Sequence, residues 1–110
     1  LMTGTELATG IRHRCRFVAL VSNNGSYGTI RLHQEKHYPG RVSGTALVNP
    51  DFAALARSFG ATGLTLATSA EAGDVVARAL AADGPAVIDV RSSLEHITAF
   101  TTLSALAPAG

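Results

Sequence analysis

Cysteine and charge are both scarce in this sequence, and each scarcity excludes a class of protein. Cys15 is the single cysteine among 110 residues, so no internal disulfide can form and a reducing compartment is expected. Charged residues make up 15% of the chain and the net charge is +1, which gives no reason to expect a nucleic-acid partner. No apolar run reaches the length of a membrane span, and no signal peptide is recognised. We therefore expect a cytoplasmic protein that binds neither nucleic acid nor membranes.

Apolar residues, in contrast, are plentiful. They make up 46% of the chain, which suffices for one core in a single domain. The sequence begins Leu1-Met2-Thr3-Gly4, without an initiator at position 1, and enters a helical pattern almost at once. We therefore expect residues 1–110 to form a single partial domain of a longer protein.

Apolar runs of strand length alternate with helical patterns along the chain. The run Phe17–Val21 is apolar throughout, which is typical of a strand buried on both faces of a parallel sheet. Strands are expected at residues 17–21, 64–66 and 86–90, and helices at residues 5–14, 29–37, 52–59 and 70–82. This order predicts an α/β fold in which helices cover a parallel sheet on both sides.

Turn and capping residues mark the ends of these helices. Asn49-Pro50-Asp51 opens the third helix, and Gly60 is placed to end it. Thr68 or Ser69 is placed to cap the fourth helix. The end of the chain has a looser pattern, and residues 107–110 are expected to fray.

The loop "SNNGSYG" follows the first strand, and open parallel sheets bind ligands outside the carboxyl ends of their strands. Asparagine side chains offer neutral oxygens, which suit hard cations such as Mg²⁺. Gly25 and Gly28 let the backbone approach a ligand closely, and the N-terminus of the next helix favours phosphate oxygens. The loop can therefore hold a Mg-diphosphate, although no carboxylate lies beside it. A plain Asn-Gly turn explains the same residues equally well.

Two other groups of residues are candidates for chemistry. His33 and His37 are four residues apart on an expected helix, which is metal-ligand spacing. No third ligand is evident, so we interpret them as part of a solvated helix face. The basic run Arg12–Arg16 is interpreted in the same way, as a solvated helix end. Cys15 has no base facing it on a helix and is expected to be a small buried or half-buried side chain.

Further motifs follow in a fixed order after the apolar strand. They read "SNNGSYGTIR", then "YPGRVSGT", then "NPDFAALARSFGA". In this order they resemble the C-terminal cofactor domain of thiamine-diphosphate enzymes of the acetolactate synthase and pyruvate decarboxylase type. The resemblance is strongest from Thr3 to Ala61 and extends to about Val90. It implies a three-layer parallel-sheet sandwich, the thiamine-diphosphate-binding fold, truncated at its N-terminal edge.

The family's metal motif opens with Gly-Asp-Gly and ends in an asparagine pair. The pair is present here, whereas the Gly-Asp-Gly would fall just upstream of Leu1. Arg16 stands where the family usually has a proline, and Ala46 stands where an acidic residue is expected. These departures leave the subfamily open.

The resemblance implies a role for each residue of the loop. Asn24 would bind Mg²⁺ through its side chain, Ser26 would bind it through its backbone carbonyl, and Asn23 would hold the loop. The implied metal ligands are therefore Asn24 and Ser26, and the implied cofactor-binding residues are Asn24, Gly25, Ser26, Tyr27, Gly28 and Thr29.

The resemblance also implies what the longer enzyme does. In this family a thiazolium ylid adds to a 2-oxo acid such as pyruvate, and a glutamate from the partner subunit's N-terminal domain helps to form that ylid. The domain that carries this glutamate is not in this chain, so we expect no catalytic residue here, and Glu6 is interpreted as a helix-surface or interface residue. The expected protein is a lyase or transferase, similar to acetolactate synthase, with thiamine diphosphate and Mg²⁺ as cofactors. It would act as a homo-oligomer, a dimer or tetramer, and the fragment alone would be inactive.

A non-catalytic α/β binding or interaction module stays open as the alternative. A dinucleotide-binding domain would need Gly-x-Gly-x-x-Gly after a strand, and the loop from Gly25 to Gly28 does not supply it.

Overall fold

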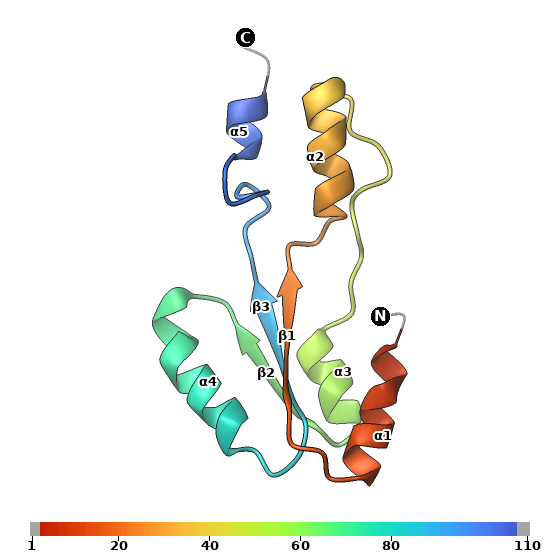
Figure 1. The fold of residues 1–110 in the computed structure, drawn as a ribbon, viewed down its shortest axis with the longest axis vertical. Coiled ribbons are helices and arrows are strands. Elements are labelled where there is room, and N and C mark those ends of the chain that lie inside the picture. Colours follow the sequence, from red (N-terminus) through yellow and green to blue (C-terminus); the bar gives the residue numbers. More distant parts are fainter. Residues whose placement is uncertain (1–2, 108–110) are drawn as a thin grey trace. The chain divides into compact units, whose positions relative to one another are not determined.

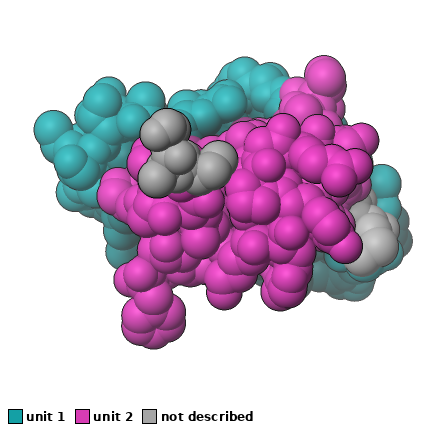
Figure 2. All heavy atoms as spheres, turned by 90° about the horizontal axis from the view of Figure 1, so that it is seen from above, with its two compact units in different colours: residues 1–22, 50–91 teal, residues 23–49, 92–110 magenta. Residues whose placement is uncertain are grey.

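The computed structural model describes residues 3–107. Its parts group into two compact units, which are residues 1–22 with 50–91 and residues 23–49 with 92–110 (Figure 2). The strands are β1 (Val18–Asn23), β2 (Thr62–Leu66) and β3 (Ala86–Arg91). The helices are α1 (Leu7–Arg12), α2 (Gly28–His37), α3 (Phe52–Ser58), α4 (Ala72–Ala81) and α5 (Leu103–Leu106), with 3₁₀ turns at Gly4–Glu6 and Ser69–Glu71.

The first unit is built on a sheet with β3 at its centre. The strand order is β1-β3-β2, and β2 runs parallel to β3 with Thr62 opposite Ala86 and Leu66 opposite Val90. Figure 1 shows α4 on one face of the sheet and α1 and α3 on the other. The expected three-layer α/β fold with a parallel sheet is therefore confirmed.

Each face of β3 contributes to a separate apolar core. On the α4 side the buried residues are Leu64, Val75, Ala79, Ala86 and Ile88. On the other side the buried residues are Ala56, Ala61 and Val87, with Leu7, Ile11, Ala19 and Val21 packed against them. Because β3 alternates between these two cores, its first four residues are all buried.

The ends of α3 and α4 form as the sequence predicts. Asp51 caps α3, since its carboxylate accepts a hydrogen bond of 2.8 Å from the backbone amide of Ala54. Gly60 follows α3 with a positive φ of 88°, a conformation that glycine adopts without strain. Thr68 begins a capping box in which the carboxylate of Glu71 accepts from the Thr68 amide at 3.2 Å.

β1 differs from the expectation of a strand buried on both faces. Its residues are mostly half-buried, and Leu20 is 67% exposed. The reason is its place in the sheet: β1 lies at one side of β3, whereas α4 packs on β2 and β3. Only the central strand of this sheet has the two-sided burial that the sequence predicted.

One further expectation is corrected. Cys15 is exposed, not buried or half-buried. Arg14 has a φ of 51°, so the chain leaves α1 in a left-handed turn, and Cys15 lies in the exposed connection to β1. The end of the chain was expected to be looser, and residues 93–102 indeed form no helix or strand. The short helix α5 follows them, and Thr102 caps it by accepting from the Ala105 amide at 3.2 Å. Of the end that was expected to fray, residues 108–110 lie outside the described residues.

The second unit contains α2, the loop before it and the strap of residues 41–49 after it. Ser26 and Ala46 form an isolated antiparallel bridge, and α5 packs against α2. The side chain of Gln34 is hydrogen-bonded to both the amide and the carbonyl of Ser43, at 3.2 and 2.9 Å. These contacts hold the strap against the helix and the loop. No helix among residues 3–107 is long and apolar enough to cross a membrane.

Candidate functional site

Asn23 holds the start of the loop. It is 8% exposed, and its side-chain oxygen accepts hydrogen bonds from the backbone amide of Gly25 at 3.2 Å and from the side-chain amide of Asn49 at 3.0 Å. Both lone pairs of that oxygen are thereby used. Asn23 is thus a structural member of the asparagine pair, in agreement with the role expected for it.

Asn24 has a different environment, because among residues 3–107 its side-chain oxygen accepts a single hydrogen bond, of 3.0 Å, from the Ser26 amide. An amide oxygen has two lone pairs, so the second stays available to a ligand. Gly28 leaves room for this side chain, since a Cβ at that position would lie only 3.0 Å from the side-chain nitrogen of Asn24. Gly25 differs from Gly28 in what it requires. Its backbone φ is 68°, and no atom lies within 4 Å of the position that a Cβ would take.

Ser26 is fixed to the strap by three hydrogen bonds around it. Its hydroxyl and the amide of Tyr27 both donate to the carbonyl of Thr45 at 2.9 Å, and the amide of Leu47 donates to the carbonyl of Gly25 at 2.9 Å. Within residues 3–107, the Ser26 carbonyl accepts no backbone hydrogen bond in this loop. The loop therefore presents two oxygens of the kind that Mg²⁺ accepts, one from an amide side chain and one from the backbone.

Thr45 is a site residue that the sequence reasoning missed. Its side chain is 1% exposed, and its hydroxyl has no hydrogen-bond partner among residues 3–107. A buried hydroxyl without a partner costs free energy, which a bound polar ligand or an ordered water removes. No motif marks this threonine in the sequence, because its burial comes from the strap that folds over Ser26.

The N-terminus of α2 follows the loop directly. The helix begins at Gly28, and Tyr27, at the N-cap position, makes no side-chain capping bond. The first intrahelical bond runs from Arg31 to Tyr27 at 2.9 Å, so the amides of the first turn are left for an outside acceptor. Tyr27 is 53% exposed and Thr29 is also exposed. Uncapped amides and the helix dipole make this end suitable for a phosphate.

A complete metal site is not formed by the described residues. Among residues 3–107 no group of three or more His, Cys, Asp and Glu residues could hold a metal ion. The loop oxygens fit a hard cation, yet Mg²⁺ is usually bound through one or two carboxylates as well. The described loop therefore offers only part of the ligand set that a Mg-diphosphate site would need.

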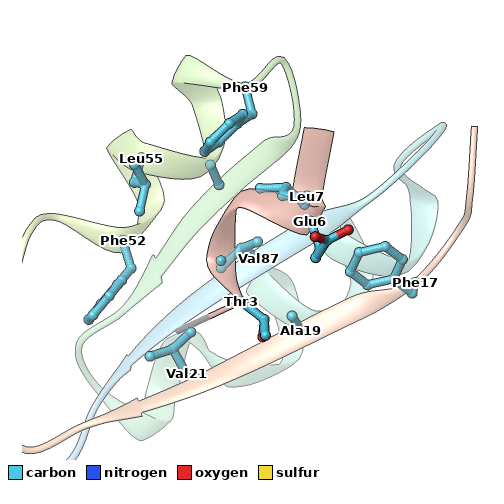
Figure 3. A pocket seen from close by; sticks show the side chains of 12 residues that line it. Thr3, Glu6, Leu7, Phe17, Ala19, Val21, Phe52, Leu55, Phe59 and Val87 are labelled. Carbon is cyan, nitrogen blue, oxygen red and sulfur yellow. The ribbon is translucent and has the colours of Figure 1, made fainter. Parts of the chain in front are cut away.

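The first unit also contains an apolar cavity. It has a volume of about 530 Å³ and is lined by apolar side chains of α1, α3, β1 and β3, with Leu7, Phe52 and Phe59 around it (Figure 3). Glu6 reaches its rim and is exposed. None of the predicted site residues lines this cavity, and Glu6 has the helix-surface position expected for it.

β3 carries a buried carboxylate that the sequence reasoning did not single out. Asp89 is 0% exposed, and its carboxylate lies 3.1 Å from the guanidinium of Arg91. The two residues are two apart on one strand and therefore share a face. This spacing was visible in the sequence, but only the structure shows that the aspartate is buried.

The basic run is exposed, as expected, and so are the two isolated histidines. His13, His96 and the residues from Arg12 to Arg16 all lie on the surface. His33 and His37 are exposed as well, and their rings stack.

Comparison with known proteins gives consistent matches. The family described as "Thiamine pyrophosphate enzyme, C-terminal TPP binding domain" matches residues 1–90. An acetolactate synthase of Bacillus subtilis is 36% identical over 90 residues, which is 82% of this chain and 16% of that protein. The acetolactate synthase large subunit of Parasynechococcus marenigrum is 36% identical over 92 residues, or 82% of this chain and 15% of the relative. A benzoylformate decarboxylase of Pseudomonas aeruginosa is 33% identical over 86 residues, or 78% of this chain and 16% of the relative. The chain therefore spans about a sixth of the length of these relatives.

Proposed function

Because this chain belongs to the thiamine pyrophosphate enzymes, as a C-terminal domain that binds thiamine pyrophosphate (thiamine diphosphate), we propose that its Asn24 loop supplies half of the anchor for Mg²⁺ and the diphosphate. The observation that carries the proposal is the arrangement of Asn24 and Ser26. The Asn24 side-chain oxygen keeps one lone pair available while its other accepts from the Ser26 amide at 3.0 Å. The Ser26 carbonyl would be the second ligand, and the strap keeps it in place.

The diphosphate would lie against the N-terminus of α2. Gly28 and Thr29 open that helix, and Tyr27 leaves its first amides uncapped. Gly25 has open space beside its Cα, so a ligand can approach the backbone closely there. Negative oxygens are favoured at such a terminus by the exposed amides and by the helix dipole.

The chain would position the cofactor and leave the chemistry to it. Thiamine diphosphate, when bound, supplies a carbanion that adds to a carbonyl and then acts as an electron sink. The described loop holds amide, hydroxyl and glycine residues and no acid or base. We therefore assign no catalytic residue to this chain, and Glu6, which is exposed at the rim of an apolar cavity, is not promoted to that role.

The activity of the whole protein is proposed from its relatives. Their names include acetolactate synthases and a benzoylformate decarboxylase. We propose a lyase or transferase similar to acetolactate synthase that decarboxylates a 2-oxo acid and forms a carbon–carbon bond with an acceptor. It would work as a homodimer or homotetramer, and the 110-residue piece alone would be inactive.

A non-catalytic α/β binding module is the second candidate. One observation favours it: residues 3–107 contain no group of three or more His, Cys, Asp and Glu residues that could hold a metal ion. In that case the asparagines would serve only as a turn, since Asn23 and Asn24 both make short local hydrogen bonds.

A titration separates the two candidates. Thiamine diphosphate is titrated into the intact protein with and without Mg²⁺, and the Asn24→Ala variant is compared with the wild type. The proposal predicts Mg-dependent binding that the substitution weakens about tenfold or more, or about 1.4 kcal/mol. The exposed Lys36→Ala substitution on α2 serves as the control and should leave affinity unchanged. Equal binding in wild type and Asn24→Ala, or none in either, supports the binding module.

A further inference from the structure

The last two turns of α2 carry a pair of imidazoles on one face. His33 and His37 are four residues apart, and their ring centroids lie 6.3 Å apart with an angle of 10° between the ring planes. Both side chains are exposed. The rings therefore lie side by side in solvent, with space to turn towards a common point.

Two charged residues near these imidazoles, Glu35 and Arg41, have other partners. Glu35 is engaged with Arg31 at 3.6 Å and with the amide of Gly40 at 3.1 Å. Arg41 lies over the ring of Tyr38 at 5.8 Å. Successive residues of a helix are about 100° apart around its axis, so Lys36 points away from the His37 face. The two ring systems are thus left to an outside ligand.

We propose that His33 and His37 form a two-point site for a late first-row divalent cation such as Zn²⁺, Ni²⁺ or Cu²⁺. Imidazole nitrogens suit these metals, whereas Mg²⁺ requires oxygen ligands. Two histidines at this spacing on one helix face supply two of the protein ligands in H-E-x-x-H zinc sites. The chain supplies two ligands, and water completes the coordination shell. The site is separate in chemistry from the proposed oxygen site at Asn24 and does not depend on it.

A bound metal would also stabilise the helix. No residue of α2 is buried, and both His33 and His37 are exposed, so the helix has room to gain stability from a bound ligand. A metal that joins positions four apart binds the helical form and not the open form, and it therefore shifts the equilibrium towards the helix. Hydrogen exchange of the α2 amides should slow when the metal is added.

The experiment is a Zn²⁺ titration of the intact protein in excess Mg²⁺ and thiamine diphosphate. Wild type is compared with His33→Gln, His37→Gln and the double variant, and the double variant is the baseline for zinc bound elsewhere. Loss of even an outer-shell partner of a metal ligand costs about 10–100-fold in affinity, so loss of either imidazole should weaken this site at least tenfold. Because two-point binding needs both rings, the double variant should bind Zn²⁺ no more weakly than either single variant does.

Two controls and a second measurement make the test specific. His13→Gln and His96→Gln remove exposed histidines that have no partner ring and should change nothing. Zn²⁺ should slow exchange of the α2 amides in wild type and in neither single variant. The proposal is overturned if the losses of Zn²⁺ binding free energy in the two single variants add up to the loss in the double variant, because independent histidines would give that result. It is also overturned if all four proteins bind Zn²⁺ alike or if Mg²⁺ displaces the zinc.

Discussion

The side-chain amide of Asn49 donates to the side-chain oxygen of Asn23 over 3.0 Å, joining two asparagines that are 26 residues apart. One stands at the end of β1, and the other stands two residues before Asp51, which caps α3. The same oxygen of Asn23 accepts from Gly25. A single side chain thus fixes both the turn of the loop and the end of the strap that holds it.

Substituting Asn49→Ala should therefore loosen the loop without touching the proposed metal ligands. A hydrogen bond of this kind contributes about 0.5–1.5 kcal/mol to the free energy of unfolding. We expect a loss in that range by chemical denaturation, together with weaker binding of Mg-thiamine diphosphate. The exposed Lys36→Ala variant should show neither effect. Unchanged stability and affinity in Asn49→Ala would mean that the asparagine tie does not hold the loop.

Gly63 and Gly73 provide a matched pair for the packing of the first unit. A Cβ at Gly63 would overlap the backbone carbonyl of Ala53, where α3 crosses β2, so Gly63→Ala forces the helix away from the strand. Overpacking costs about 1–3 kcal/mol, and backbone cannot move aside as a side chain can, so we expect the upper end of that range. At Gly73, on α4, no atom lies within 4 Å of a new Cβ. Gly73→Ala should be neutral or should stabilise by up to about 1 kcal/mol. Equal effects at both positions in thermal unfolding would contradict the packing of α3 on β2.

The helix α5 should be sensitive to acid. Hydrogen bonds from the side chain and the backbone amide of Ser104 hold the pKa of Glu95 below its ordinary value of 4.5. A lowered pKa means that the folded form gains stability from the charged carboxylate above pH 4.5 and loses it as the pH falls through the lower value. Amide protection in α5 should therefore fall on acidification in this range. Glu95→Gln should remove this pH dependence of amide protection in α5. Protection that stays constant below pH 4.5 in the wild type would refute the prediction.

Gly25 offers a test of the loop backbone. Its φ of 68° is left-handed, and a side chain there would meet no other atom. Gly25→Ala should therefore cost about 1–2 kcal/mol through backbone strain alone. Because the strain acts on the loop that would carry Asn24 and Ser26, affinity for Mg-thiamine diphosphate should fall as well. Denaturation and cofactor titration on the same variant measure the two effects, and an unchanged free energy of unfolding would show that this turn tolerates other conformations.

Local signals in the sequence were sufficient where a helix end or a strand is decided by nearby residues. Asp51 and Gly60 bracket α3 as predicted, because capping and left-handed conformations depend on the residues themselves. The alternation of strands and helices likewise predicted the parallel sheet. The asparagine loop was found in the same way, from a strand that ends in amides and glycines.

Features that depend on segments far apart in the chain could not be predicted from the sequence. The burial of Thr45 and the tie from Asn49 to Asn23 arise only when the strap folds back over the loop. The exposure of Leu20 depends on which strand lies at the centre of the sheet, and a run of apolar residues does not say this. α5 is four residues long and is held by its cap and by α2, so its periodicity was too short to detect.

The central claim is that Asn24 is a metal ligand and not only a turn residue. It is tested most directly by measuring thiamine diphosphate binding to an Asn24→Cys variant of the intact protein in Mg²⁺ and in Cd²⁺. A thiolate is a soft ligand that binds Mg²⁺ poorly and soft cations well. We predict that the variant binds the cofactor about tenfold or more weakly than wild type in Mg²⁺ and regains affinity in Cd²⁺. An equal loss in both metals would contradict the account and leave Asn24 as a residue that only shapes the loop.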